Sequence, residues 1–186
     1  MAKKSSETQI IQNYGVLFEN VKKDTVLATE LAEYGYDATA ITQGENLYQT
    51  LLAKYSTNKT ETAEETTAYA NFNSHFEALV AVYATDRKKA KIVFKNQPDV
   101  FKNLELVGNA PVRNASVLNS ISIFYNALQN NAAWLTSLNH LRITATHVNE
   151  QLTKLATTQS AYATYVQEKG ESQQATQDKN KAFDDV

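Results

Sequence analysis

The chain has 186 residues, of which 42% are hydrophobic and 20% charged, a composition typical of a folded globular protein. Its formal net charge of −2 provides no basic surplus for binding phosphates, so we expect no nucleic-acid partner. The absence of cysteine excludes disulfides, cysteine-ligated zinc and iron–sulfur clusters. Glycine and proline are scarce, which disfavours a turn-rich β-protein and favours long helices.

No apolar stretch approaches the roughly 18 residues that are needed to span a bilayer. The first residues are charged and lack the apolar segment of a signal peptide. The sequence therefore predicts a cytoplasmic protein without a transmembrane segment, provided that no leader has been removed.

The segment from Ser6 to Tyr34 carries apolar residues mostly three or four positions apart, the spacing of one helix face. Ser6 and Gln9 can form a capping box at its start. At its end, Gly35 suits the left-handed position that follows a helix, and Asp37 can cap the next helix. The pattern predicts two helices joined by a tight turn.

The second helix is expected to end at Tyr55, because the polar residues 56–62 interrupt its apolar pattern. Thr62 and Glu65 form a second capping box, which predicts a third helix that runs to about Lys95. Gly44 lies alone inside the second helix and indicates a close contact with another helix.

Residues 96–110 lose the helical pattern and have a proline near each end, which predicts a linker with one helical turn near 99–104. The expected organisation is a first three-helix unit at 1–95, this linker, and a second three-helix unit at 111–186. The two units can pack together as one domain.

The second half repeats the first at a constant spacing of 107 residues (117 − 10 = 107), which pairs Ile10 with Val117 and Phe18 with Tyr125. Two amphipathic helices can match in phase because they share a period. A register that holds across three helices and two turns instead indicates duplication of one unit.

Two differences separate the copies. Arg142 stands where the first turn has Gly35, which predicts a looser or nearly helical second turn, with Thr144 as the cap. Val186 corresponds to Leu79, so the second unit lacks roughly four turns of helix at about 3.6 residues per turn. We therefore expect a chain that is cut short.

Together these patterns predict an all-α fold, an elongated bundle of about six helices in two tandem three-helix pseudo-repeats, the second truncated.

Three segments resemble a family of uncharacterised bacterial helical-bundle proteins: Gln174–Ala182, Leu141-Arg142-Ile143-Thr144 and Pro111-Val112-Arg113. That family normally has glycine at the position of Arg142 and a tryptophan-containing helix after the segment ending at Ala182. The resemblance covers the second half of the chain. It implies an all-helical bacterial protein with a missing end, and it implies no known activity.

The three histidines are the first candidates for chemistry. His147 and Glu150 share a helix face, a spacing that can hold a metal, but no acidic residue precedes any histidine by three positions, as a di-iron bundle requires. His140 is separated from His147 by the turn at Arg142. His75 suits a seam between helices. We expect ordinary, partly exposed histidines and no metal site.

Enzyme and nucleotide motifs give no candidate. No spacing of serine or threonine with histidine and an acid selects a catalytic set, and the sequence contains neither a glycine-rich dinucleotide motif nor a P-loop. The helix after Gly35 carries no arginine or lysine in its first turns, which excludes a DNA-reading helix. We predict a non-enzyme with no catalytic, cofactor-binding or metal-binding residues.

Two surface features remain. The basic cluster formed by Arg87, Lys88, Lys89, Lys91 and Lys95 lies in the last turns of a helix, where a solvated helix end explains it and an anionic partner is the alternative. Most of the ten tyrosines lie on apolar helix faces, which suits core packing and also protein interfaces or a pocket.

The leading functional hypothesis is a structural or protein–protein interaction module that binds a protein partner or itself. One alternative is a bundle that binds a small or amphipathic ligand between the repeats. The other is a helical protein that interacts with a membrane surface.

Overall fold

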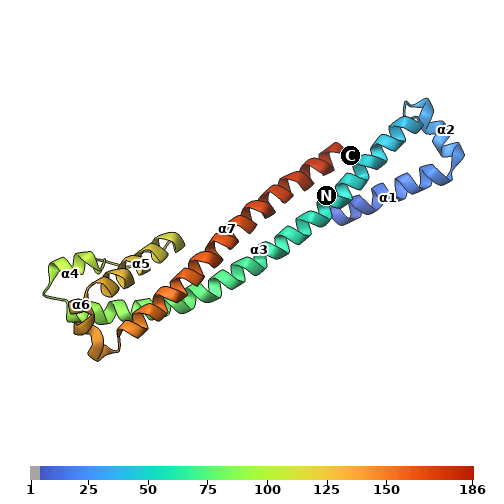
Figure 1. Cartoon of the computed structure of the whole chain (residues 1–186). Helices are drawn as coiled ribbons and strands as arrows, with labels where there is room; N and C mark the ends of the chain where they lie inside the picture. Colours follow the sequence, from blue (N-terminus) through green and yellow to red (C-terminus); the bar gives the residue numbers. More distant parts are fainter. Residues whose placement is uncertain (1–4) are drawn as a thin grey trace. The chain divides into compact units, whose positions relative to one another are not determined.

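The computed structural model describes residues 5–186, and in this range it contains seven α-helices, one 3-10 helix and no strand (Figure 1). The predicted all-α fold is confirmed. None of the described helices is both long and apolar enough to cross a membrane. The charged start at residues 1–4, which bears on the predicted localisation, lies outside the described residues. In chain order the elements are α1 (Glu7–Lys23), α2 (Thr25–Glu33), α3 (Ala38–Val93), α4 (Pro98–Asn103), α5 (Asn114–Asn130), α6 (Ala132–Leu138), η1 (Asn139–Leu141) and α7 (Ala145–Asp185).

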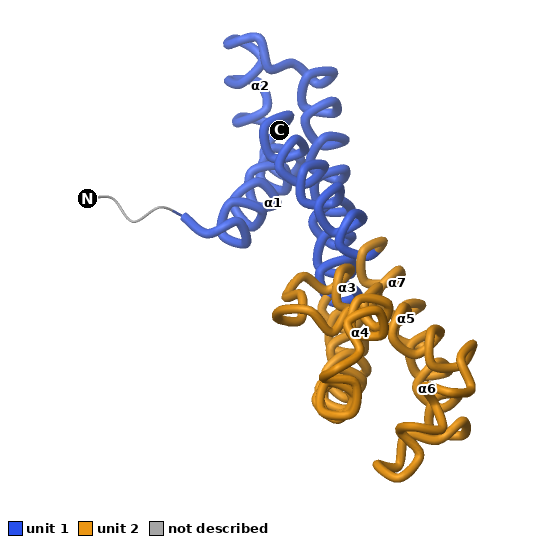
Figure 2. The backbone as a smooth tube through the Cα atoms, turned by 90° about the vertical axis from the view of Figure 1, so that its left-hand side faces the viewer, with its two compact units in different colours: residues 1–65, 168–186 blue, residues 66–167 orange. Residues whose placement is uncertain are grey.

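The chain forms two compact units, shown in different colours in Figure 2. Unit 1 contains residues 1–65 and 168–186, and unit 2 contains residues 66–167. This division differs from the expected boundaries at 95 and 111. The physical reason is that α3 and α7 are long enough to contribute one part to each unit.

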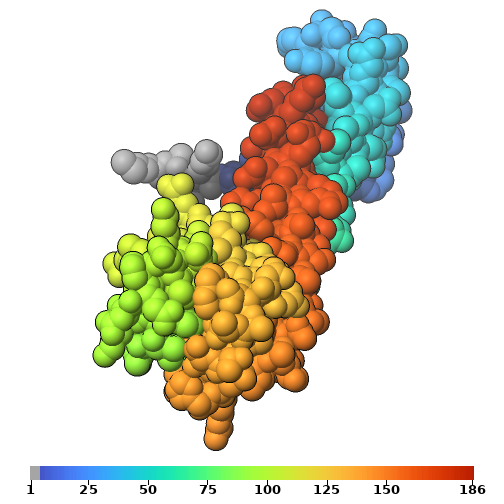
Figure 3. Space-filling model, turned by 60° about the vertical axis from the view of Figure 1, so that its left-hand side comes forward, coloured from blue at the N-terminus to red at the C-terminus, as the bar shows by residue number. Residues whose placement is uncertain are grey.

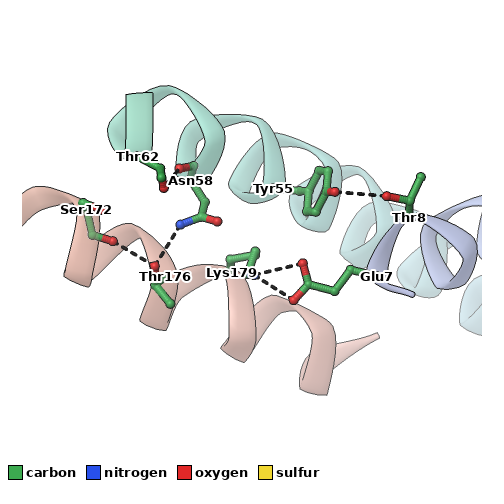
Figure 4. A network of polar contacts seen from close by, with 8 residues as sticks. All are labelled: Glu7, Thr8, Tyr55, Asn58, Thr62, Ser172, Thr176 and Lys179. Atoms are coloured by element: carbon green, nitrogen blue, oxygen red, sulfur yellow. Dashed lines mark hydrogen bonds and ion pairs between the residues drawn. The ribbon is translucent and has the colours of Figure 1, made fainter. Parts of the chain in front are cut away.

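Helix α3 runs without interruption through residues 56–62, so the predicted break there is wrong. No glycine or proline interrupts this stretch, and the Thr60 hydroxyl bonds to the carbonyl four residues earlier. In unit 1, α7 lies antiparallel beside this part of α3. Asn58 donates to the Thr176 hydroxyl at 2.9 Å (Figure 4). Lys54 pairs with Asp178 at 2.7 Å. These tertiary contacts outweigh the low helix propensity of the polar run.

Helix α1 is held to both long helices in unit 1. Lys179 of α7 reaches both carboxylate oxygens of Glu7, at 2.7 and 3.0 Å, and the hydroxyls of Thr8 and Tyr55 are 3.2 Å apart (Figure 4). The start of α1 has the expected cap, because the Ser6 hydroxyl accepts from the Gln9 amide.

The first predicted helix, from Ser6 to Tyr34, is two helices that meet at Asp24. The Asp24 carboxylate accepts hydrogen bonds from the first amides of α2 and thereby starts a new helix. Asn131 does the same for α6, accepting from the Trp134 amide at 3.1 Å. The sequence pattern missed both breaks because the apolar spacing continues through them.

The turns before α3 and α7 have the same conformation. Gly35 has φ 90° and Arg142 has φ 66°, both in the left-handed region. The Tyr36 amide donates to the Leu31 carbonyl, and the Ile143 amide makes the corresponding bond at the second turn. The expected looser or nearly helical turn at Arg142 is therefore wrong: the arginine adopts the conformation of the glycine.

The elements of the two halves keep the spacing found in the sequence. Helix α1 spans Glu7–Lys23 and α5 spans Asn114–Asn130, so both ends are displaced by 107 residues (114 − 7 = 107; 130 − 23 = 107). The same displacement relates the first residues of α3 and α7, Ala38 and Ala145. We call two positions with this spacing equivalent.

Unit 2 contains the larger core. Aromatic residues of α3 and α5 meet there, with Tyr83 packing edge-on against Phe124 at 5.5 Å between ring centroids. Helix α4, close to the helical turn predicted within the linker, lies on the surface of unit 2 beside α5 (Figure 3). Its residue Val100 and the following Leu104 and Leu106 are buried in the same core.

The core of unit 1 is smaller. Phe18 and Val21 of α1 and Leu51 of α3 are buried there, and the Phe18 ring packs against Tyr48 of α3, 5.7 Å away between ring centroids. Gly44 allows this approach, since a β-carbon there would lie 3.2 Å from the Phe18 ring, and the expected close helix contact is confirmed.

Candidate functional site

Unit 2 contains a buried carboxylate, Asp86 of α3, whose side chain has three partners. Its Oδ2 accepts a hydrogen bond from the Tyr125 hydroxyl at 2.9 Å and lies 2.5 Å from His147 Nε2. Lys89 Nζ is 3.5 Å from Oδ1. Burial raises the pKa of Tyr125, and the Asp86 charge raises it further. The phenol therefore stays protonated and remains a donor to Asp86.

This cluster has two parts of a general-base arrangement, a histidine oriented by a buried carboxylate. Among the described residues, however, the contacts of the His147 ring are Asp86 and the edge of the Tyr125 ring. A nucleophile is missing from this set. The cluster joins α3, α5 and α7, and we assign it to the stability of unit 2.

The structure places the other histidines and Glu150 apart from this cluster. His147 is half-buried and bound to Asp86, 61 positions away in the sequence, so no local pattern connected the two. Glu150, His140 and His75 are exposed. The expected position of His75 at a helix seam is therefore wrong.

The basic cluster is only partly a solvated helix end. Lys88 and Lys95 are exposed, as expected, but Arg87 is buried. Its Nη2 donates to the carbonyls of Glu105 and Gly108, at 3.0 and 3.3 Å, so it holds the loop after α4 against α3. No sequence pattern indicated this role of Arg87, because its acceptors are backbone carbonyls of a distant loop.

A second group of ionisable side chains lies where α3 and α7 meet in unit 1. Oxygens of Glu61, Glu168 and Glu171 all lie within 4.8 Å of one another. Burial raises the pKa of Glu168, and the charges of Glu171, Glu64 and Glu61 raise it further. Carboxylates are ligands for hard divalent cations. In the protein alone, they repel one another across the helix pair.

The sequence contained a signal for this group. Glu61 and Glu64 are equivalent to Glu168 and Glu171, so one pair of glutamates occurs on both long helices. The sequence did not show that the two pairs face each other, because the antiparallel pairing of α3 with α7 was not predicted.

The tyrosines divide between core and surface. Tyr83 and Tyr125 are fully buried in unit 2, as core packing predicts. Tyr34, Tyr36 and Tyr69 are exposed. Two of the exposed tyrosines belong to a larger apolar surface at the α1–α2 end of unit 1.

This surface surrounds a groove between α1, α2 and the start of α3, which we call the unit 1 groove. Its volume is about 450 Å³, and apolar side chains dominate its lining, including Val21, Tyr36 and Ile41. Other apolar residues of α1, α2 and the start of α3 are exposed outside the groove: Val16, Leu17, Val26, Tyr34 and Leu47.

Two of these exposed apolar residues, Leu17 and Tyr36, have fully buried equivalents in unit 2. Leu17 is 48% exposed, whereas its equivalent Phe124 is 0% exposed. Tyr36 is 58% exposed, whereas its equivalent Ile143 is 0% exposed. In unit 2 the last turns of α3 and the segment around α4 cover α5. Among the described residues, nothing takes that place in unit 1.

The surface near the unit 1 groove carries an excess of acidic residues. Both lysines of residues 5–48 are paired, Lys22 with Glu45 and Lys23 with Glu19. The unpaired surplus gives this end of unit 1 a negative field. Six carboxylates stand against these two lysines: Glu19, Asp24, Glu30, Glu33, Asp37 and Glu45. Glu7, at the other end of α1, is paired with Lys179.

A search among protein-family models, curated proteins and solved structures finds no match to this chain.

Proposed function

We propose that this chain is a non-enzymatic helical interaction module, and that unit 1 binds a basic, amphipathic helix of a partner protein in the unit 1 groove. The observation that carries the proposal is the difference in exposure between equivalent positions. Apolar side chains such as Leu17 and Tyr36 are exposed in unit 1, whereas their equivalents form the core of unit 2. Exposed apolar surface of this kind marks an interaction site.

The packing within unit 2 indicates how a partner helix would bind to unit 1. There, a helical segment of the chain itself, residues 79–106, packs across α5, with Tyr83 against Phe124 and Tyr125. This segment has six basic and three acidic residues. A helix of the same kind fits the unit 1 groove in shape, because α1 occupies the position equivalent to α5. It also fits in charge, because the surface around the groove is acidic.

One difference between the units defines the partner further. Phe18 and Ala40 stand at the positions equivalent to Tyr125 and His147, the residues that bind Asp86 in unit 2. Unit 1 therefore offers no partner for a buried carboxylate at this point. The bound helix needs an apolar residue there, because an unpaired buried charge costs several kcal/mol.

The proposal includes the duplication. Two copies of one three-helix unit explain why the helices, caps and turns recur at one spacing, and the resemblance to bacterial helical-bundle proteins is compatible with such a module. We propose a cytoplasmic protein in which unit 2 is covered by a helical segment of the chain itself and the unit 1 groove accepts a basic, amphipathic helix of the same kind.

The test uses a labelled peptide with the sequence of residues 79–106 and the substitution Asp86→Leu. Fluorescence anisotropy with the whole chain should show saturable binding. The same peptide with Asp86 retained should bind at least ten-fold more weakly, about 1.4 kcal/mol in binding free energy. A preference for the aspartate peptide, or no saturable binding by either one, would contradict the proposal.

A matched pair of variants locates the binding. Leu17→Glu adds a charge on the exposed surface beside the groove and should abolish binding of the peptide. Val166→Glu makes the same change at a residue of α7 with similar exposure, 51%, outside the groove, and should leave binding unchanged. Equal loss in both variants would show that the peptide does not bind in the groove.

A further inference from the structure

Unit 2 contains a second cavity that the proposed partner helix does not use. It lies between α3, the segment 110–112 and the start of α5, and its volume is about 460 Å³, within the usual range for small-molecule sites. Apolar side chains form most of its wall: Phe76, Val80, Ala84, Pro111, Val112 and Val117.

One end of this cavity is polar and cationic. Arg87, Lys88 and Lys91 of α3 line it, and no acidic residue does. Burial lowers the pKa of Lys91, and the neighbouring Arg87 charge lowers it further. Glu105 lies nearby, but its carboxylate accepts a hydrogen bond from Ser120 at 2.6 Å. An anion at this end would be attracted by three cations.

Two buried polar groups of the lining, the Tyr83 hydroxyl and Arg87 Nε, make no hydrogen bond of normal geometry. Burial raises the pKa of the Tyr83 phenol, and the nearby Arg87 guanidinium acts against this rise. Tyr83 is 2% exposed and Arg87 is 8% exposed, so water does not satisfy them freely. The Arg87 guanidinium is held in place by two loop carbonyls, and Lys91 donates to one of them, Gly108, at 2.8 Å. Buried donors without a well-placed acceptor are rare in native proteins, and both donors here line the cavity, where an acceptor atom of a ligand can reach them.

We propose that this cavity binds a free amphiphile with one apolar chain and a carboxylate head. The chain lies along the apolar wall formed by Phe76, Val80 and Val117. The carboxylate accepts hydrogen bonds from the Tyr83 hydroxyl and Arg87 Nε and is attracted by the two lysines. This site is independent of the unit 1 groove and of the proposed partner helix.

The test is isothermal titration of the whole chain with decanoate. Decanol, with the same chain and no charge, and decyltrimethylammonium, with the opposite charge, are the comparison probes. We expect saturable binding of one decanoate per chain, at least ten-fold tighter than decanol, and no saturable binding of the cation. Equal affinity for decanoate and decanol would overturn the proposal, because the polar end would then have no role.

Variants separate this cavity from other apolar surfaces. Tyr83→Phe removes only a hydroxyl that makes no hydrogen bond of normal geometry, so the protein should fold, and decanoate affinity should fall about ten-fold while decanol affinity stays the same. Ala84→Phe, at an exposed position of the wall, should abolish binding of both. Tyr69→Phe, on α3 outside the cavity, is the matched control. Unchanged decanoate binding in Tyr83→Phe and Ala84→Phe would place the ligand elsewhere and refute the site.

Discussion

Arg142 is the residue at which local preference and tertiary structure disagree most directly. An arginine in the left-handed region is unfavourable because its β-carbon approaches the backbone, and the equivalent position in the first turn is a glycine. The turn keeps this conformation because the packing on both sides of it, including buried Leu138 and Ile143, requires the same reversal of the chain.

Replacing this arginine with glycine should therefore stabilise the protein. We expect Arg142→Gly to raise the free energy of unfolding by about 1 kcal/mol in a urea titration. Gly35→Ala is the matched control of opposite sign, since Gly35 has φ 90° and open space around it, so only backbone strain changes. A lower stability of Arg142→Gly would show that the arginine side chain contributes more than the strain costs.

Glu168 should make stability depend on pH. Its pKa is raised above the ordinary value of 4.5 by burial and by the glutamates around it, so the folded chain binds this proton more tightly than the unfolded chain. Stability therefore falls as pH rises from about 4.5 through the raised pKa.

Glu168→Gln should accordingly raise the melting temperature at neutral pH and reduce its decline above pH 4.5. Asp178→Asn should do the opposite and lower it, because a hydrogen bond from Lys54 lowers the pKa of Asp178. Thermal unfolding monitored by circular dichroism at a series of pH values measures both. An unchanged pH profile in Glu168→Gln would rule out this repulsion.

At the scale of elements, α3 is the helix whose extent matters most, because it contributes to both units. Its middle section contains serine, threonine and asparagine, and propensity alone favours a break there. The contacts of Lys54 and Asn58 with α7 compensate for this weakness. A helix with a weak middle section that is held by tertiary contacts should be sensitive to a single proline.

Thr60→Pro tests the continuity of α3. Proline in a helix interior removes a hydrogen bond and clashes with the preceding turn, at a cost of about 3 kcal/mol or more. We expect Thr60→Pro to lower the free energy of unfolding by that amount and to reduce helicity in circular dichroism, and Thr60→Ala, the control, to change little. Full tolerance of the proline would indicate a loop at residues 56–62, as the sequence pattern predicts.

The helix caps and turns were predicted from the sequence more successfully than the helix breaks and the long-range contacts. Helix caps such as Ser6 and Asp37 and the turn at Gly35 are visible in the sequence, because they depend on residues within four positions. The capping breaks at Asp24 and Asn131 were missed, since an aspartate or asparagine inside an apolar pattern is ambiguous. The pair of Asp86 with His147 and the role of Arg87 depend on chain segments far apart, which periodicity cannot bring together.

At the scale of the whole molecule, the sequence spacing of 107 residues corresponds to helix boundaries in both halves, yet equivalent positions have different surroundings. Phe124 and Ile143 are buried in unit 2, whereas Leu17 and Tyr36 are exposed in unit 1. The apolar pattern placed all four on helix faces that suit core packing or an interface. It could not show which copy has a covering segment, because that depends on the path of α3 and α4.

Because α5 is covered by other segments of the chain and α1 is not, we expect α1 and α2 to be locally less stable than α5 and α6. Amides of α1 and α2 should exchange with deuterium faster than those of α5 and α6, since local opening is governed by buried apolar contact.

The measurement that tests the central claim most directly is hydrogen–deuterium exchange of the whole chain, with and without the Asp86→Leu peptide of residues 79–106. We predict that the peptide slows exchange in α1, α2 and the start of α3, and that α5 and α6 are unchanged. Slower exchange confined to α5 and α6, or no change anywhere at saturating peptide, would contradict a helix-binding site on unit 1.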